Sequence, residues 1–193
     1  MTYYTILESP VGKLLISSDE THLTRLFMED HVGGPTANSD FANSPETTVF
    51  GREGKFGNIP HADWQRDDKH PPLAQARQQL SEYFAGKRTD FDLPLKPAGS
   101  GFQLEVWNQL TKIPFGQTIT YGELAKRIGK PDAPRAVGLA NGSNPISLII
   151  PCHRVIGASG KLTGYGGGLD RKVWLLEHEG AMPSGRQPEL AMS

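Results

Sequence analysis

A proline- and glycine-rich stretch at residues 90–100 divides this sequence into two halves whose apolar residues follow different spacings. Near the start of the chain, over residues 4–16, apolar and polar residues alternate, which is typical of half-buried strands. After the proline- and glycine-rich stretch, apolar residues recur every three or four positions, which is typical of helices. Because proline and glycine interrupt both kinds of element, the sequence predicts an α+β chain with an N-terminal domain over residues 1–90 and a mostly helical domain over residues 98–182.

The N-terminal half begins with three predicted strands. Tyr4 and Ile6 alternate with polar residues, a Ser-Pro-Val-Gly turn follows, and Leu14 and Ile16 alternate again. A third apolar run covers residues 23–27. Because short turns join antiparallel neighbours, these runs predict a small antiparallel sheet.

Two segments of this half, and the end of the chain, have other compositions. Residues 33–70 are rich in glycine, proline, asparagine, aspartate and serine, which predicts a long insertion at the surface. Pro71 and Pro72 then open a predicted helix, which stops at Gly86. At the other end of the chain, residues 183–193 predict a flexible tail.

The second half predicts a helix–turn–helix. A first helix covers residues 102–113 and ends at the proline that follows. Thr120 and Glu123 have the spacing of a capping box at the start of a short helix. A Gly-Lys-Pro-Asp turn and a second short helix over residues 133–141 complete the pattern. This arrangement is common in DNA-binding proteins, but taken alone it is a weak indication.

Cys152 is the only cysteine of the sequence, so the chain can form neither an internal disulfide nor a cysteine-rich zinc site. It follows an apolar run, residues 146–150, that predicts a short strand. A lone thiol in such a place is either an inert buried side chain or a nucleophile. A nucleophilic thiol needs a proton acceptor or a positive charge nearby, and His153 and Arg154 follow directly.

Adjacent residues of an extended chain point to opposite sides, so a bound water or a turn is needed to connect Cys152 with His153. Glu177 and Glu179 lie in a predicted last helix that Asp170 caps, and either could orient the imidazole. Spacing alone leaves two interpretations open: a Cys-His-Glu relay, or a buried cysteine beside a surface histidine.

The net charge of −1 is unevenly distributed. Residues 1–99 carry 10 Lys and Arg against 14 Asp and Glu, whereas residues 100–180 carry 9 against 6. The mildly basic second half permits contact with phosphates without requiring it. No apolar run approaches the roughly 20 residues of a membrane-spanning helix, and the start of the chain lacks a signal-peptide pattern. We therefore expect a cytoplasmic protein with no membrane partner.

Several runs in the second half match one extended pattern: Thr120–Tyr121, Arg135–Gly138, Asn144–Pro145, Ile149–Ile156, Gly160, Gly164–Gly168 and Trp174–Gly180, together with the helix around Trp107. Over roughly residues 90–180 this pattern resembles the O6-alkylguanine-DNA alkyltransferases, also called methylated-DNA–protein-cysteine methyltransferases. The resemblance implies a ribonuclease H-like N-terminal domain packed on a C-terminal domain that contains the helix–turn–helix.

The resemblance assigns roles to the residues around the thiol. Cys152 would be the alkyl acceptor, His153 would take the thiol proton through a bound water, and Glu179 would orient the histidine. Asn144 would brace the turn, and Tyr165 would donate a hydrogen bond to guanine O6, where charge develops as the alkyl group leaves. The implied pocket residues are Tyr121, Pro151, Leu162, Tyr165, Gly166 and Gly167.

The resemblance also implies double-stranded DNA as the partner, bound through its minor groove with the alkylated base flipped out. Tyr121 would press on the phosphate of the damaged nucleotide, and Arg135 would enter the stack in place of the base. The helix that carries Arg135 has many small residues, which would let its backbone lie close to DNA. The implied DNA-binding residues are Tyr121, Gly122, Lys130, Arg135, Ala136, Gly138 and Ala158.

The implied activity is stoichiometric transfer of an alkyl group from O6-alkylguanine, and from O4-alkylthymine, to Cys152. The product is a thioether, which has no carbonyl for water to attack, so each monomer repairs one lesion and is spent. No cofactor is expected, and no metal, because relatives with a structural zinc use N-terminal cysteines that this chain lacks. Two alternatives are a helix–turn–helix protein that binds DNA without chemistry, and a thiol hydrolase with many turnovers.

Overall fold

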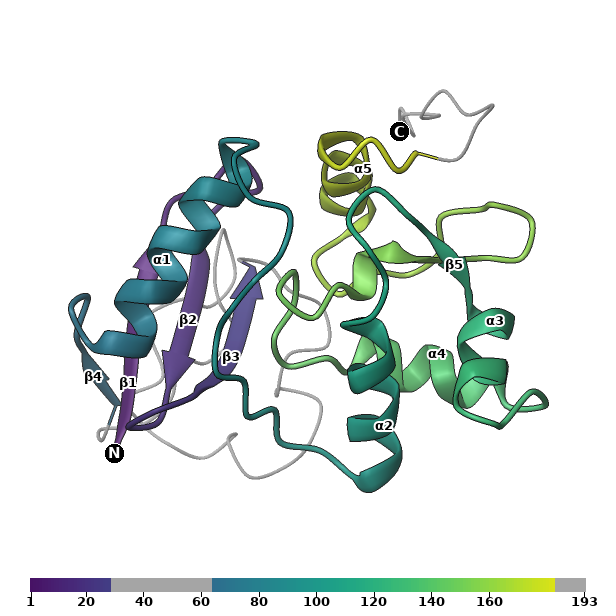
Figure 1. Ribbon diagram of the computed structural model, residues 1–193, viewed down its shortest axis with the longest axis horizontal. Helices are drawn as coiled ribbons and strands as arrows, with labels where there is room; N and C mark the ends of the chain where they lie inside the picture. The colour runs from purple at the N-terminus through teal and green to yellow at the C-terminus, as the bar shows by residue number, and fades with distance from the viewer. Residues whose placement is uncertain (29–63, 183–193) are drawn as a thin grey trace.

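The computed structural model describes residues 1–28 and 64–182 and has the predicted α+β architecture. In Figure 1, a sheet crossed by helix α1 occupies one side of the molecule, and the remaining labelled helices gather on the other. Within the described residues, none of the helices is both long and apolar enough to cross a membrane. The N-terminal elements are β1 (Thr2–Leu7), β2 (Leu14–Ser18), β3 (Leu23–Met28), β4 (Trp64–Arg66) and α1 (Pro71–Phe84).

The first three strands form as the alternating pattern predicts. β1 pairs antiparallel with β2, and β2 pairs antiparallel with β3. The turn between β1 and β2 places Gly12 at φ 95°, a backbone conformation that favours glycine. The amide of Gly12 donates to the carbonyl of Ser9 over 3.0 Å and closes that turn.

The fourth strand corrects one expectation. β4 pairs parallel with β1, so the sheet is mixed rather than antiparallel, with the order β3-β2-β1-β4. β4 falls near the end of the surface insertion predicted over residues 33–70, of which residues 33–63 lie outside the described residues. Three residues with one apolar side chain give no readable alternation, and the packing of Trp64 on Tyr4 and Arg25 favours this strand instead.

Helix α1 confirms the prediction made from its proline start and its spacing. Proline occupies its first position, and Gly86 takes φ 69° just beyond its end. The side chains that it buries against β1 and β2 recur at intervals of three or four. They include Leu73, Ala76, Leu80 and Tyr83.

The C-terminal part is mostly helical, as predicted, with one short parallel strand pair between β5 and β6. Helix α2 begins with a capping box between Ser100 and Gln103 that the sequence analysis did not identify. The box predicted at Thr120 is half formed: Thr120 accepts from the amide of Glu123, whose carboxylate instead pairs with Arg127 at 2.6 Å. The elements are α2 (Gly101–Leu110), β5 (Ile119–Thr120), α3 (Tyr121–Arg127), α4 (Pro134–Gly142), the 3-10 turn η2 (Cys152–Arg154), β6 (Val155–Ile156) and α5 (Leu169–His178).

Helices α3 and α4 pack on each other and on α2, and they form the predicted helix–turn–helix. Gly129 at φ 69° allows the chain to reverse after α3. The indole of Trp107 in α2 donates to the carbonyl of Ala140 in α4 over 2.8 Å. Gly99 is required beneath this indole, since a Cβ there would lie 2.5 Å from the ring.

β3 is the outermost strand of the sheet, and its outer edge joins the two parts of the molecule. Leu23 exchanges backbone hydrogen bonds with Pro94 and Lys96 of the linker. Further along the same strand, the amide of Leu26 donates to Pro145 over 2.8 Å, and its carbonyl accepts from Ser147 over 3.2 Å. One hydrophobic core runs through both parts. The segment that leads to Cys152 is therefore held directly against the N-terminal sheet.

Candidate active site

Residues 146–150 do not form the strand that their apolar composition predicts. Leu148 takes φ 73°, and the amide of Ile149 donates to Ser147 over 2.9 Å, so this part of the chain is a tight turn. The side chain of Asn144 holds the turn at both ends, because it accepts from the amide of Ile146 over 3.0 Å and donates to the carbonyl of Ile150 over 2.8 Å. Asn144 is thus placed where the predicted bracing role requires.

Cys152 begins the 3-10 turn η2 and is 4% exposed. Since Cys152 and His153 belong to a turn rather than to an extended strand, their side chains are free of the strict alternation expected from the sequence. Burial raises the pKa of the Cys152 thiol, while hydrogen bonds from Asn144 and Ser147 and the charge of Lys172 act in the opposite direction. At neutral pH the resting group is therefore a thiol that needs a base.

His153 is fully buried beside Glu179, with 2.9 Å between its Nε2 and the Oε1 of the carboxylate. Burial lowers the pKa of His153 although the charge of Glu179 opposes this, so the imidazole is neutral at physiological pH. A carboxylate can only accept, so Nε2 carries the proton. The other nitrogen, Nδ1, has no hydrogen-bond partner among the described residues and presents a lone pair. A neutral imidazole held in this tautomer can act as a proton acceptor.

Of the two glutamates that could orient the imidazole, only Glu179 is buried: it lies directly after α5 and is 4% exposed, whereas Glu177 is exposed. Arg154 donates to both oxygens of Glu179, over 2.8 Å and 3.0 Å, and Tyr83 donates to Oε1 over 2.7 Å. Burial alone would raise the pKa of Glu179, but the hydrogen bonds from His153 and Arg154 lower it to about 2. The carboxylate is therefore permanently charged at physiological pH.

A buried lysine supplies positive charge that the sequence analysis did not anticipate. Lys172 is 0% exposed, and its Nζ donates to the carbonyls of Val155 and Thr163 over 2.7 Å and 2.9 Å. Burial lowers the pKa of Lys172 to about 8. Its charge favours the thiolate of Cys152. The signal in the sequence was a lysine on the same helix face as Leu175, Leu176 and Glu179, where the spacing predicts burial.

The two tyrosines of the predicted pocket lie close to the thiol. Tyr165 is 8% exposed, its ring meets that of His153 edge to face at 6.4 Å, and its hydroxyl donates to the sulfur of Met28 at 3.8 Å. Burial raises the pKa of Tyr165 well above its usual value, so the phenol remains a donor. Burial also raises the pKa of Tyr121, whose hydroxyl interacts with Thr163 and Asn141.

The glycine-rich loop is tied to the N-terminal domain. Arg171 donates to the carbonyls of Val11 and Gly167 over 2.7 Å and 2.8 Å. A Cβ at Gly167 would lie 2.7 Å from the sulfur of Met28, so this position has room only for glycine. The loop ends at Gly168, which caps α5 with φ 90°. The prediction that Asp170 caps this helix is wrong, because Asp170 lies inside its first turn.

The remaining predicted pocket residues, in and before this loop, differ in exposure. Pro151 is buried directly before the thiol, whereas Leu162 and Gly166 are half-buried. Gly167 is buried beneath Tyr165. Of the predicted pocket residues, Pro151 adjoins Cys152 in the chain, and Tyr121 and Tyr165 interact electrostatically with its thiol.

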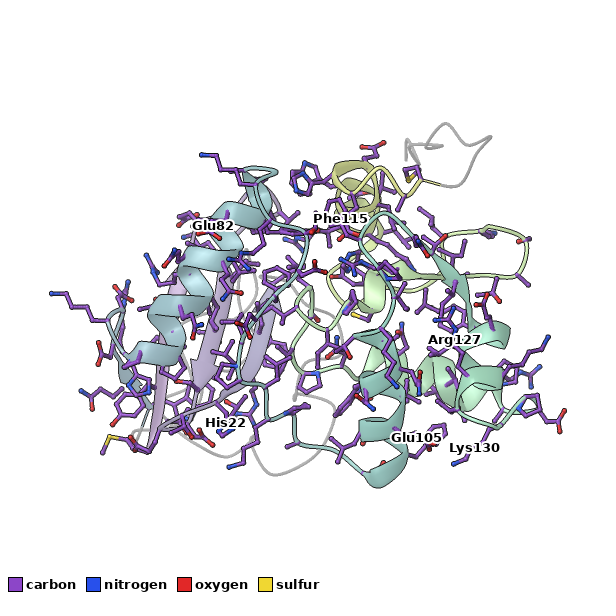
Figure 2. The ribbon with its side chains drawn as sticks, viewed as in Figure 1. His22, Glu82, Glu105, Phe115, Arg127 and Lys130 are labelled. Atoms are coloured by element: carbon purple, nitrogen blue, oxygen red, sulfur yellow. The ribbon has the colours of Figure 1, made fainter. Side chains whose placement is uncertain are left out.

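The residues predicted to bind DNA lie mainly on α4 and the turn before it. Arg135 and Ala136 are exposed, and Arg135 makes no hydrogen bond or ion pair with the described residues. Lys130 lies beside Glu105 (Figure 2), with 3.6 Å between its Nζ and the carboxylate and its ammonium 4.7 Å above the Phe102 ring. The others are the half-buried Gly122 and Gly138 and the exposed Ala158.

Comparison with known proteins gives two family-model matches that together span most of the chain. A model described as 6-O-methylguanine DNA methyltransferase, ribonuclease-like domain, matches residues 2–97. A second, described as 6-O-methylguanine DNA methyltransferase, DNA binding domain, matches residues 101–181. The chain belongs to the 6-O-methylguanine DNA methyltransferase family.

Relatives of this methyltransferase family match over nearly their whole length. The methylated-DNA–protein-cysteine methyltransferase of Methanosarcina acetivorans is 45% identical over 179 residues, which cover 93% of this chain and 99% of that protein. The protein of the same name from Mycolicibacterium paratuberculosis is 47% identical and covers 93% of each. A crystal structure of Mycobacterium tuberculosis OGT in complex with DNA is similar at a TM-score of 0.73, with 43% identity and coverage of 93% and 94%.

Proposed function

We propose that this methyltransferase-family protein repairs DNA directly, by moving the alkyl group of O6-alkylguanine onto the sulfur of Cys152. The observation that carries the proposal is the buried relay: His153, in the same turn as Cys152, binds an ionised Glu179 through Nε2, and its Nδ1 is unpartnered among the described residues. The names of the relatives, methylated-DNA–protein-cysteine methyltransferase, support the same activity.

The relay has the parts that the transfer needs. His153 accepts the thiol proton through a water, and the sulfur attacks the alkyl carbon that is bonded to O6. A carbon–sulfur bond forms as the carbon–oxygen bond breaks, and the electron pair stays on the guanine. A hydrogen bond from Tyr165 stabilises this developing charge. The charge of Glu179 stabilises the imidazolium that results.

The product at Cys152 is a thioether, and its stability makes the transfer stoichiometric. Thiolate is a poor leaving group from an sp3 carbon, and a thioether has no carbonyl for water to attack. One molecule of protein therefore removes one alkyl group. O4-alkylthymine has the same bond between an alkyl carbon and a ring oxygen, so we include it as a second substrate.

The proposed DNA contacts follow from the exposed face of α4. Arg135, which is free of partners among the described residues, replaces the flipped base in the stack. Ala136 and Gly138 let the helix approach the floor of the minor groove, while Gly122, Lys130 and Ala158 lie at its margins. Tyr121 meets both the flipped nucleotide and its phosphate. The relative solved in complex with DNA supports a DNA partner.

In this function the chain acts as a monomer with two parts. Residues 98–182 supply the acceptor and the DNA-binding helices. Residues 1–90 hold the site in place through the hydrogen bonds of β3 and of Tyr83. Every residue of the relay comes from one chain, so one copy is sufficient. A reactive lone thiol stays reduced in the cytoplasm, which is where we place the protein.

Mass spectrometry of the intact protein tests the activity. After incubation with duplex DNA that contains O6-methylguanine, we expect one added methyl group per protein, located on Cys152, and a matching loss of methyl from the DNA. Cys152→Ser should gain none. An unchanged protein mass with repeated consumption of substrate would favour a hydrolase. Lesion binding without transfer by the intact protein would favour a DNA-binding protein without chemistry.

A further inference from the structure

The carboxylate of the relay has a donor from the other half of the molecule. The hydroxyl of Tyr83, near the end of α1 in the N-terminal part, donates to Oε1 of Glu179 over 2.7 Å, and the contact is buried. In Figure 1, the end of α1 approaches α5 across the junction between the two parts. The linked residues are 96 positions apart in the chain.

Tyr83 is held firmly in this position. Its side chain is 0% exposed, and its ring packs against those of Phe91 at 5.4 Å and His178 at 5.0 Å. The backbone carbonyl of Tyr83 accepts from Nε2 of His178 over 2.8 Å. Burial, together with the charge of Glu179, raises the pKa of the Tyr83 phenol far above its usual value. The hydroxyl is thus a permanent donor in a fixed place.

Tyr83 and His153 both donate a hydrogen bond to the same oxygen of the Glu179 carboxylate. Oε1 receives the hydroxyl of Tyr83 at 2.7 Å, Nε2 of His153 at 2.9 Å and a guanidinium nitrogen of Arg154 at 3.0 Å. Oε2 receives only Arg154 among the described residues, at 2.8 Å. A donor that withdraws charge from Oε1 weakens the attraction of that oxygen for a protonated imidazole.

We propose that Tyr83 is a positioning residue for the alkyl transfer, which fixes Glu179 against His153 and limits how basic the histidine becomes. The inference rests on the proposed repair function. The charged and titratable groups around His153 are Lys172 from α5, Glu179 directly after α5, Arg154 and Cys152 from its own turn, and Tyr165 from the glycine-rich loop. Tyr83 reaches the histidine from α1 through its hydrogen bond to Glu179, and it also interacts electrostatically with Tyr165 and Arg154.

Tyr83→Phe removes only the hydroxyl and keeps the packed ring. The charge on Oε1 then concentrates on the bond to His153, so the pKa of the histidine rises by about half a unit to one unit. Because a protonated imidazole cannot take the thiol proton, the acid limb of the single-turnover transfer rate moves to higher pH by the same amount. The plateau rate falls several-fold, since the carboxylate loses one of its fixed contacts.

The experiment measures two quantities in Tyr83→Phe and in the matched control Tyr4→Phe, which removes a hydroxyl from the separate cluster around Leu15. The first is the pH profile of alkyl transfer. The second is the pKa of His153 by nuclear magnetic resonance of labelled histidine, assigned by its absence in His153→Gln. We expect both to shift upward in Tyr83→Phe and neither in the control.

The histidine measurement separates this inference from the proposed function, because it needs no DNA. An unchanged His153 pKa in Tyr83→Phe overturns the inference even if repair is intact, and so does a loss of thermal stability with the pH profile unmoved. A wild-type protein that transfers no alkyl group overturns the repair function, while the histidine shift still decides whether Tyr83 acts through Glu179.

Discussion

At the scale of single residues, the site holds one negative charge, on Glu179, and two positive charges, on Arg154 and Lys172, away from water. Glu179 balances Arg154, and Lys172 is stabilised by two carbonyls and by proximity to the thiol. Buried charges of this kind are tolerated only when their hydrogen bonds are complete. The cysteine can therefore become a thiolate without leaving an unpaired negative charge in the core.

Acid should destabilise the protein through Glu179. Its folded pKa of about 2 lies below the ordinary value of 4.5, so its stabilising contribution is complete above pH 4.5 and is lost as the pH falls toward 2. This contribution is on the order of 3 kcal/mol. Urea unfolding at a series of pH values should show the loss in wild type. Glu179→Gln, which leaves Arg154 without its counter-charge, should be less stable at neutral pH and should lack that part of the acid dependence.

Lys172→Met should make the thiol harder to ionise. Without the positive charge, the pKa of Cys152 rises by about one unit, and the transfer rate at neutral pH falls. The pH dependence of thiol alkylation by iodoacetamide measures this directly. Lys161→Met, which removes an exposed lysine from the neighbouring loop, serves as the control. An alkylation midpoint equal to that of wild type would contradict the electrostatic role.

At the scale of elements, α4 exposes one charged and one apolar side chain on the face opposite the core. Val137 and Ala140 face the core, while Arg135 and Leu139 are exposed one turn apart. Leu139 is 78% exposed, which is unusual for a leucine on a packed helix. The proposed minor-groove contact would cover this side chain together with Arg135.

Arg135→Ala should slow repair of duplex DNA by about tenfold and leave transfer from free O6-methylguanine unchanged. The proposed role of Arg135 is to fill the gap left by the flipped base, and flipping costs a few kcal/mol only when the base is stacked in a duplex. Single-turnover rates on the two substrates measure the difference. Arg88→Ala, on the N-terminal part, should affect neither. Equal slowing on both substrates would place Arg135 in the chemistry instead.

The elements differ in how far their sequences determine them. β1 to β3, α1 and the helix pair α3–α4 have clear periods, and their identity was predicted. Residues 146–150 have the apolar composition of a strand. The hydrogen bonds of the Asn144 side chain and the positive φ of Leu148 fold them into a tight turn instead. β4 depends on pairing with β1, which no local pattern reveals.

The residues of the candidate site also differ in how far the sequence reveals them. A resemblance along the sequence indicated Cys152, His153 and Glu179, because they lie in continuous motifs. Tyr83 and Lys172 escaped notice for different reasons. Tyr83 reaches Glu179 only through the packing of α1 on the other half, whereas the burial of Lys172 could have been predicted from its helical spacing with Leu175 and Leu176. Contacts between distant segments are set by tertiary structure and leave no local signature.

At the scale of the whole molecule, the edge of β3 makes the two parts mechanically dependent. It pairs with the linker at Leu23 and with the segment before Cys152 at Leu26, and both side chains are 0% exposed in the shared core. A strand edge covered in this way is also protected from pairing with other chains.

The two parts should therefore unfold together. We expect amide signals from β2 and from α5 to disappear at the same urea concentration, in one transition. Leu26→Ala should lower the free energy of unfolding by about 2–5 kcal/mol and keep the transition single, because the cavity lies in the common core. Separate midpoints for the two sets of amides would show independent domains.

The bond between Tyr83 and Glu179 has a consequence for the newly made chain. Synthesis proceeds from the N-terminus, so the sheet and α1 leave the ribosome while Glu179 has yet to be added. An unfinished polypeptide already contains Cys152 but has no carboxylate to orient its neighbour. In the proposed mechanism, the thiol thus gains its base only after Glu179 has been added, and a product that stops before Glu179 carries a sulfur that is poorly equipped to react.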